Sequence, residues 1–504
     1  MNISIITQLH TIINNMEHID FICREYSLAK SEVIEKLHNA GYKLKPIVKQ
    51  FPWTGAVCKE SCQGLKYCEG LVIKKIKHYI DIFKSEYTYI AFDGVPPYAK
   101  IKQQRTRRYK SYITKHLLDQ HSGWNRCSIT PGTHFMSKLN KELQSTFNDA
   151  NLYYLSTSSM EGEAEHKIFS YIRSETNMLS NKNIVLFGLD ADLIMLSLYH
   201  LKYVNNILLY RDSSGFSTIK NDRDNVMDIF KLQCVIHEKL EITITVYMFI
   251  CFLLGNDFLP HFPSLNIRKH GIDKIAKVFR SCNIKLVSEE LYPKIIWNDL
   301  RIFVEALAKS EVSEFKSNYS EKIKQRQVFS NFSNEEKLVN LPSLDCTLEL
   351  CINPFTDKWN VSYYKHLFDI DINIDSKSLS KICLNYMEGL EWVLNYYTGN
   401  IKVDWSWCYR YLYPPLLQDL VKYVPFYDTS FIKKRSSEFT EVMLLCYVIP
   451  KDSIELIPKN IQLKLNKELY RDDCQIIWAY CKYFWESHPI LNDIDINELK
   501  LAVS

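Results

Sequence analysis

Short apolar runs in the first half of the chain have the length of β-strands and predict strands buried on both faces. They cover residues 87–92, 184–187 and 206–210 and are rich in aromatic, aliphatic and β-branched side chains. Continuous apolar character is typical of strands in a parallel sheet, because helices cover both faces of such a sheet. The first two runs stop at turn-forming and acidic residues, Asp93-Gly94 and Gly188-Leu189-Asp190.

Helical patterns lie between these runs, at residues 70–83, 165–173 and 193–201. The alternation of strands and helices predicts an α/β domain with a mostly parallel, twisted sheet flanked by helices. The longest apolar run, residues 242–254, falls short of the roughly 18 to 20 residues of a membrane span. We therefore expect a buried helix there and no association with membranes. From about residue 310 to residue 340 the chain is hydrophilic, which indicates a linker with some helix.

The composition is that of a globular protein. The chain has 504 residues, of which 46% are hydrophobic and 24% charged, and its 62 Lys and Arg against 58 Asp and Glu give a net charge of +4. Because the overall charge is small, any binding of nucleic acid must come from a local basic patch. The 15 cysteines are scattered without paired spacing, which favours reduced thiols inside a cell. Cys58, Cys62 and Cys68 lie closest together, but ordinary thiols are favoured over zinc because no second Cys or His pair follows.

Three aspartates follow the predicted strands. Asp93 ends the first strand, and Asp190 and Asp192 come directly after the second. Ligands of open α/β sheets bind beyond the carboxyl ends of the strands, where side chains can converge without disturbing the packed layers. Taken singly, each aspartate is better explained as an ordinary helix N-cap.

Three further acids strengthen the case for a shared site. Glu163 and Glu165 lie two residues apart in a small-residue turn before an amphipathic helix. Asp257 follows a very apolar helix and the predicted C-cap Gly255. A lone carboxylate in apolar surroundings is costly, so Asp257 should be paired, protonated or bound to metal. Carboxylate oxygens suit Mg²⁺, and a pair of metal ions can stabilise both the attacking and the leaving oxygen in phosphoryl transfer.

A basic segment follows Asp93 almost at once. Residues 100–115 contain seven Lys or Arg residues and no acid. Next to a candidate metal ligand, this density favours binding of a phosphate, for which arginine offers bidentate donors. A solvated helix face and a nuclear localisation signal are the alternatives.

Together these segments resemble the XRN family of 5′→3′ exoribonucleases, within the wider PIN-like superfamily that includes flap endonucleases. The resemblance runs in family order from about residue 70 to residue 425. The matching stretches are residues 92–108, 129–136, 162–167, 188–196, 255–261, 359–368, 389–394 and 405–415.

The resemblance implies a site and a reaction. It implies one or two Mg²⁺ ions, with Mn²⁺ as a substitute. The implied ligands are Asp93, Glu163, Glu165, Asp190, Asp192 and Asp257. It implies a pocket for the 5′-monophosphate of single-stranded RNA formed by Lys100, Gln104, Arg107 and Arg108, and a base stacked on Trp407. For Trp392 and Trp405 packing in the core is favoured over substrate contact. The implied reaction is processive release of nucleoside 5′-monophosphates in RNA decay.

The resemblance also divides the chain. We expect a divergent segment at 1–70, a nuclease α/β domain at 70–300, and a helical, polar linker at 301–355. A largely helical second family region at 356–430 would cover the active site, and a helical region would complete the chain at 431–504. A cytoplasmic location is expected, with the nucleus as the alternative.

The chain departs from the family near its start. Members usually have there a strand that ends in Asp-x-Asn, and spacing from Asp93 places it between residues 43 and 53, where this sequence has no acid. Asp20 is the nearest substitute, but no Asn follows it two residues on. Two hypotheses therefore stand beside the exoribonuclease. One is a catalytically impaired protein that binds RNA 5′ ends, and the other is a structure-specific 5′-nuclease acting on DNA.

Overall fold

The structure is a computed structural model. It describes residues 2–6, 62–118, 125–188, 191–211, 225–325, 333–400, 403–471 and 474–504. The chain divides into two compact units. The first comprises Met1–Gly94, Ser122–Ile194 and Tyr203–Ile229, and the second comprises Val95–His121, Met195–Lys202 and Phe230–Ser504.

The first unit is built on a six-stranded sheet with the strand order β3-β2-β1-β4-β5-β6. The strands are β1 (Asn2–Ile6), β2 (Tyr87–Ala91), β3 (Tyr153–Ser156), β4 (Asn183–Phe187), β5 (Asn206–Arg211) and β6 (Asn225–Asp228). All neighbours pair in parallel except β5 and β6, which are antiparallel. The mostly parallel sheet and the predicted strands β2, β4 and β5 are thus confirmed. The central position of β1, paired with both β2 and β4, is a finding that the hydrophobic pattern did not predict.

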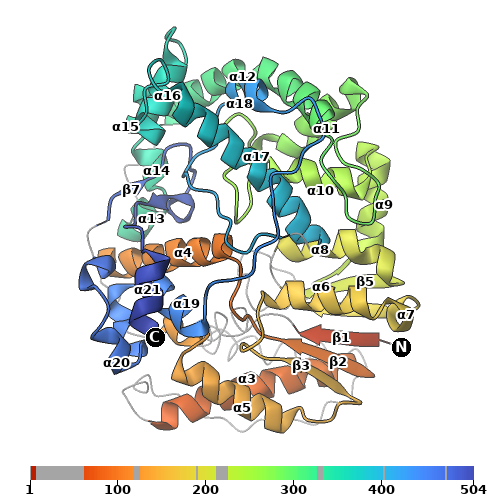
Figure 1. Cartoon of the computed structure of the whole chain (residues 1–504). Coiled ribbons are helices and arrows are strands. Elements are labelled where there is room, and N and C mark those ends of the chain that lie inside the picture. Colours follow the sequence, from red (N-terminus) through yellow and green to blue (C-terminus); the bar gives the residue numbers. More distant parts are fainter. Residues whose placement is uncertain are drawn as a thin grey trace. The chain divides into compact units, whose positions relative to one another are not determined.

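Helices cover both faces of this sheet (Figure 1). They are α3 (Cys62–Phe83), α5 (His134–Thr146), α6 (Ala164–Ser174) and the short α7 (Thr176–Leu179). On one face, Tyr79 of α3 lies 4.0 Å from the ring of Phe187, and both belong to one buried cluster with Ile90 and residues of α5. On the other face, the ring of Tyr89 lies 4.8 Å from Tyr171 of α6. Tyr89 and Ile90 are successive residues and therefore point to opposite faces of the sheet.

The second unit is largely helical, as predicted. Two helices, α8 (Asp192–His200) and α9 (Ile229–Leu240), begin in the first unit and continue in the second. The others are α4 (Tyr98–Leu117), α10 (Ile244–Phe252), α11 (Gly271–Cys282), α12 (Trp297–Gln325), α13 (Asn334–Val339), α14 (Leu341–Leu344), α15 (Thr347–Cys351), α16 (Trp359–Phe368), α17 (Ser376–Thr398), α18 (Leu417–Tyr423), α19 (Glu441–Val448), α20 (Lys459–Gln462) and α21 (Ile496–Val503). Two short antiparallel strands, β7 (Ile476–Ile477) and β8 (His488–Pro489), join them.

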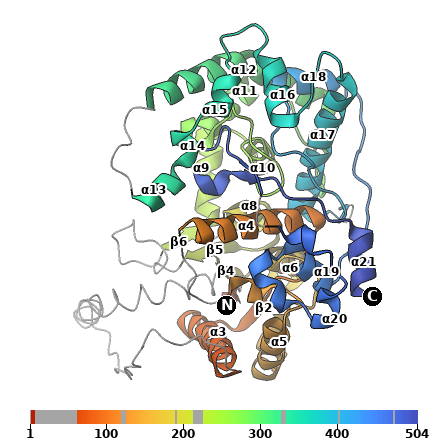
Figure 2. The ribbon, with the colours of Figure 1, turned by 90° about the vertical axis from the view of Figure 1, so that its left-hand side faces the viewer.

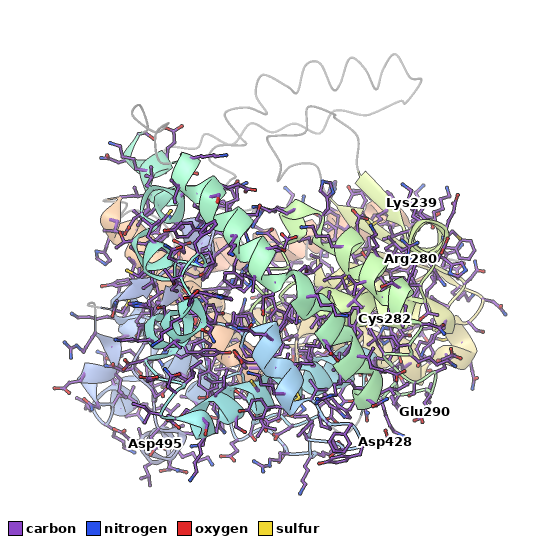
Figure 3. All side chains as sticks on the ribbon, turned by 90° about the horizontal axis from the view of Figure 1, so that it is seen from above. Lys239, Arg280, Cys282, Glu290, Asp428 and Asp495 are labelled. Carbon is purple, nitrogen blue, oxygen red and sulfur yellow. The ribbon has the colours of Figure 1, made fainter. Side chains whose placement is uncertain are left out.

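The apolar run at 242–254 is confirmed as the buried helix α10. Thr243 begins the helix, and its hydroxyl oxygen accepts a hydrogen bond from the backbone N–H of Val246. In the part of the chain that the structure describes, no helix combines the length and apolar character that crossing a bilayer requires. In Figure 3, Lys239 and Arg280 mark the neighbouring C-terminal ends of α9 and α11, where Arg280 forms an ion pair with Glu241 at 3.5 Å.

The segment 301–355, expected to be a helical, polar linker, consists mostly of α12 to α15. Helix α12 holds both ends of α18. Near the start of α12, Arg301 donates to the backbone oxygens of Val421 and Val424. Two to three turns further on, Glu311 accepts from the backbone N–H groups of Leu417 and Gln418, at 2.7 and 3.0 Å. Glu311 and Arg301 thereby bind backbone groups at the two ends of α18 that lack partners within the helix.

Candidate functional site

In the first unit, Asp93 lies beside the N-terminus of α6. Its Oδ1 atom accepts a hydrogen bond of 2.8 Å from the backbone N–H of Ala164. Ala164 is the residue between Glu163 and Glu165, so the structure brings these three predicted acids together. Glu163 is the N-cap residue of α6, yet its side chain makes no capping hydrogen bond. Asp93 thus binds the first amide of α6 from outside the helix, and Glu163 and Glu165 are each 3% exposed.

The close approach of the two loops depends on glycine. The backbone N–H of Gly94 donates to the carbonyl oxygen of Gly162 at 2.9 Å, and a Cβ atom on Gly94 would lie only 1.8 Å from the carbonyl oxygen of Met160. No other residue fits at position 94 without moving this backbone. The glycines of the Asp93-Gly94 and Gly162-Glu163 sequences therefore set the distance between the acids.

Lys167 is a residue of this site that the sequence analysis did not assign. Its ammonium group donates to the backbone oxygens of Phe92 and Thr157, at 2.9 and 3.0 Å. These two residues follow β2 and β3, so Lys167 joins both strand ends to α6. The side chain thereby fixes the backbone immediately before Asp93. Its place in the motif 162–167 was visible in the sequence, but its partners were not.

Asp192 lies at the same edge of the sheet as Asp93. It is the first residue of α8 and follows β4, whereas Asp93 follows β2, and both strands run parallel to β1. Parallel strands end at one edge of a sheet, so the predicted placement of these two acids is observed. Asp190 and Asp20 lie outside the described residues, as does the segment 43–53. Among the described residues no group of three His, Cys, Asp or Glu side chains could hold a metal ion. The full ligand set stays a prediction.

In the second unit, Asp257 pairs with Lys100 of α4. The Lys100 Nζ atom lies 2.7 Å from Asp257 Oδ2, and Lys100 is 7% exposed. Asp257 lies in a tight turn after α10, where Gly255 has a φ of +90° and Asn256 Oδ1 accepts from the N–H groups of Phe258 and Leu259. The expectation that Asp257 needs a partner is confirmed. Its partner in the structure is a cation that the resemblance implies as a phosphate ligand.

The charges around Asp257 decide its protonation. Burial raises the pKa of its carboxyl group, but Lys100, which also donates a hydrogen bond, and Arg107 outweigh burial, so the pKa lies below its usual value. Gln103 adds a hydrogen bond to the same carboxylate. Asp257 is therefore an anion at neutral pH, as a metal ligand must be. Gln103 is a second residue that the sequence analysis did not assign. It precedes Gln104, which the resemblance assigns to the phosphate pocket.

The remaining pocket residues also lie on α4. Arg107 is exposed, whereas Gln104 and Arg108 are half-buried. The first backbone N–H group of α4, that of Tyr98, cannot bind a ligand, because it donates to the carbonyl oxygen of Trp405. Phosphate binding at α4 would therefore depend on side chains rather than on the helix N-terminus.

Trp407 lies in a stack of aromatic rings in the second unit. Its ring stacks on Trp392 at 5.1 Å, and Trp392 stacks on Tyr396 at 4.8 Å. The indole N–H of Trp407 points to Glu388 Oε2 at 3.3 Å, and Gly389 leaves room for the ring, since a Cβ atom there would lie 3.0 Å from it. Trp392 is fully buried and donates to the backbone oxygen of Asp404, as expected for core packing. Trp407 is 7% exposed, and its contact with a base stays a prediction.

Two family profiles match the chain. The profile described as "XRN 5′-3′ exonuclease N-terminus" matches residues 65–213, and "Xrn1 helical domain" matches residues 237–348 and 352–488. The fold, the ordered motifs and these matches define an exonuclease-type protein with a PIN-like sheet domain and a helical domain. The chain belongs to the XRN 5′→3′ exoribonuclease family.

Curated relatives match over most of the chain. The 5′-3′ exoribonuclease 2 of Gallus gallus is 26% identical over 570 residues, which cover 82% of this chain and 59% of the relative. The 5′-3′ exoribonuclease 1 of Homo sapiens is 25% identical over 534 residues, which cover 86% of this chain and 30% of the relative. This chain therefore spans less than two thirds of the length of these relatives.

Proposed function

We propose that this protein is a 5′→3′ exoribonuclease that degrades 5′-monophosphorylated, single-stranded RNA to nucleoside 5′-monophosphates in RNA decay. Membership of the XRN family and relatives named 5′-3′ exoribonucleases support the reaction. The observation that carries the substrate class is the pair of Lys100 and Asp257. It links the basic helix α4 directly to one of the implied metal ligands.

The chemistry of the donor set supports a divalent cation. The implied ligands Asp93, Glu163, Glu165, Asp190, Asp192 and Asp257 offer oxygen atoms only, the type that Mg²⁺ prefers. Glu163 and Glu165 are buried, and burial of two carboxylates so close in sequence favours a nearby positive charge. We propose one or two Mg²⁺ ions, with Mn²⁺ as a substitute. When bound, they would supply an activated water and neutralise charge on the scissile phosphate.

The protein's own residues would bind and orient the RNA. The guanidinium groups of Arg107 and Arg108 and the amide of Gln104 would bind the 5′-monophosphate through hydrogen bonds and charge. Such a pocket selects one phosphate over a cap or a triphosphate by its size. Trp407 would stack on a base, which is tolerant of sequence because every base has a π face. Each new 5′ phosphate would bind in the same pocket, so degradation would be processive.

Mononucleotide release with Mg²⁺ tests this proposal. We expect the wild type to release nucleoside 5′-monophosphates from 5′-monophosphorylated RNA. The variant Asp190→Ala should release them at a far lower rate. Asp428→Ala is the matched control, because Asp428 is an exposed acid on the surface of the second unit (Figure 3). Equal release by the wild type and Asp190→Ala would refute the proposal.

The absence of an acid between residues 43 and 53 in the sequence motivates the second candidate, a catalytically impaired protein that binds RNA 5′ ends. It predicts binding to 5′-monophosphorylated RNA without turnover at any Mg²⁺ or Mn²⁺ concentration. A DNA flap assayed beside the single-stranded RNA distinguishes both from a DNA 5′-nuclease. A cytoplasmic location, or a nuclear one, is also our proposal, supported by the scattered cysteines of the sequence.

A further inference from the structure

The basic helix α4 has two faces with different partners. With about 100° of rotation per residue, Tyr98, Arg105, Tyr109 and Tyr112 form one stripe along the helix. Tyr98 is half-buried and the other three residues are at most 8% exposed. Of the implied pocket residues, Lys100 and Arg107 lie on the opposite side, about 140° and 160° away from Arg105, whereas Gln104 and Arg108 lie about 100° and 60° away. Arg105 is therefore directed away from Lys100 and Arg107.

Arg105 is buried against the C-terminal part of the chain. It is 4% exposed, and its Nη1 atom donates to the backbone oxygen of Asn492 at 2.8 Å. Its guanidinium group also lies 5.0 Å from the centre of the Tyr447 ring in α19 and 5.6 Å from that of Tyr109. The Nε atom has no hydrogen-bond partner among the described residues. Burial of a guanidinium group on a carbonyl oxygen and aromatic rings is costly, so this contact indicates a specific role.

Other contacts join the same two segments. Helix α19 lies beside α4 (Figure 2), and both α19 and β8 contact it. The hydroxyl groups of Tyr98 and Tyr447 are 3.1 Å apart, and the ring of Tyr98 stacks on Phe439 at 5.6 Å. Further along α4, the ammonium group of Lys110 donates to the backbone oxygen of Trp485. The contacts cover about three turns of α4, from Tyr98 to Lys110.

We propose that Phe439, helix α19 and residues 485–492 form a clamp that positions α4 for binding the RNA 5′ phosphate, with Arg105 as its central positioning residue. The inference rests on the proposed function, and it assigns a role to a part of the chain in which the sequence showed no motif. A rigid helix matters because the implied phosphate ligands along it must keep their mutual geometry. Arg105 itself does not touch the phosphate.

Binding measured without catalysis tests the clamp. The probes are single-stranded RNAs with a 3′ fluorophore and either a 5′-monophosphate or a 5′-hydroxyl end, and the buffer contains EDTA to prevent turnover. The readout is the preference, defined as the Kd for the hydroxyl end divided by the Kd for the monophosphate end. A variant that only loses folded protein loses binding to both probes equally, so its preference stays the same.

We expect Arg105→Ala to lower the preference by about tenfold, and Arg105→Lys, which keeps the charge but shortens the reach, to lower it less. Tyr447→Leu leaves the sequence of α4 unchanged and removes only the ring beneath the guanidinium group. It should lower the preference as well. Lys500→Ala is the control, because Lys500 pairs with Glu438 at the surface of the same C-terminal part. Its preference should equal that of the wild type.

Salt dependence separates positioning from direct contact. Each phosphate contact on a single strand contributes a slope of about −0.7 to the dependence of log K on log salt concentration. Arg105→Ala should keep the wild-type slope, whereas loss of about 0.7 would make Arg105 a phosphate ligand and overturn the proposal. A wild-type preference in both Arg105→Ala and Tyr447→Leu would also overturn it. If the wild type itself shows no preference, the phosphate pocket of the proposed function is wrong. That failure is distinguishable from a failure of the clamp, which leaves the wild-type preference intact.

Discussion

The contact between Lys100 and Asp257 is an ion pair between two residues of the implied site. Its two members are 157 residues apart in sequence and meet at 2.7 Å. The sequence predicted that Asp257 needs a partner, because a carboxylate in apolar surroundings is costly. It did not identify Lys100, since a contact over this separation depends on how α4 packs after folding. The same holds for Lys167, whose motif was evident and whose two carbonyl partners were not.

Replacement of Lys100 should destabilise the protein in a pH-dependent way. In the wild type, the pKa of Asp257 is lowered by Lys100, so its contribution to stability is present above the usual carboxyl pKa and is lost as the pH falls through the folded-state pKa. In Lys100→Met, burial dominates and raises this pKa. At pH 7 the free energy of unfolding of the variant should be lower by about 2 kcal/mol. The loss is smaller than for a fully buried pair, because the Asp257 side chain is 30% exposed.

Urea denaturation at pH 7 and pH 5 measures this effect. The deficit of Lys100→Met should shrink at pH 5, because the uncompensated carboxyl group can then take up a proton. Lys274→Met is the control, since Lys274 and Glu314 form a surface pair at 2.8 Å whose loss should cost about 0.5 kcal/mol. A deficit equal at both pH values would contradict the account of this pair.

Arg107 is the exposed cation of the implied pocket, and its role can be tested by salt. Arg107→Ala should weaken binding to 5′-monophosphorylated RNA and reduce the slope of log K against log salt concentration by about 0.7. The measurement is fluorescence anisotropy at several salt concentrations. A slope that does not change would show that Arg107 does not contact phosphate.

At the scale of elements, the sequence predicts best those strands that are buried on both faces, because burial makes their sequence continuously apolar. Strands β2, β4 and β5 have such continuous apolar sequences and were predicted. The edge strands β3 and β6 have four residues each, and β1 has the sequence Asn-Ile-Ser-Ile-Ile, which is too short and too polar to stand out. In the segment 301–355, Glu311 is buried but looks like a surface residue in the sequence, so its contact with α18 was not predicted.

Glu311 should make the attachment of α18 to α12 dependent on pH. Burial raises the pKa of its carboxyl group to about 7, although the N–H groups of Gln418 and Leu417 act against this. The folded state therefore takes up a proton more readily than the unfolded state, and stability should fall as the pH rises from about 4.5 to about 7. Between pH 4.5 and pH 8 the fall should be about 3 kcal/mol, since one pKa unit corresponds to about 1.4 kcal/mol.

Denaturation of the wild type and Glu311→Gln between pH 4.5 and pH 8 checks this prediction. The glutamine side chain cannot titrate. The difference in free energy of unfolding between the two proteins should therefore change over this pH range by the fall predicted for Glu311. Parallel pH profiles of the wild type and Glu311→Gln would show that Glu311 does not titrate in this range.

Two glycines on helices should respond in opposite ways to alanine. A Cβ atom on Gly389 of α17 would lie 2.5 Å from Leu259 and 3.0 Å from the Trp407 ring, whereas nothing lies within 4 Å of one on Gly70 of α3. Gly389→Ala should lower stability by about 1–3 kcal/mol through overpacking. Gly70→Ala should raise it by up to about 1 kcal/mol through helix propensity.

Thermal denaturation and the near-ultraviolet circular dichroism of the tryptophans measure both effects. The spectrum should change in Gly389→Ala, because Trp407 must move, and should stay the same in Gly70→Ala. An unchanged spectrum and an unchanged Tm in Gly389→Ala would contradict the tight packing of Trp407 on α17.

At the scale of the whole molecule, the two units carry different parts of the proposed reaction. The sheet unit holds Asp93, Glu163, Glu165 and Asp192 near strand ends, and the helical unit holds Asp257 beside the cations of α4. The family resemblance placed all of these residues in one region, 70–300, and did not predict their distribution over two units. The contacts that fix each part, such as the cap of Asp93 on Ala164, depend on three-dimensional packing and could not be predicted from spacing.

The most direct test of the central claim compares RNAs that differ only at the 5′ end. With Mg²⁺, the wild-type protein should release mononucleotides from 5′-monophosphorylated RNA, starting at the 5′ end, and should act much more slowly on the same RNA with a 5′-hydroxyl. Labels placed separately at the 5′ and 3′ ends establish the direction of degradation. Equal rates on both ends, or release that starts at the 3′ end, would contradict the proposed pocket for the 5′ phosphate on α4.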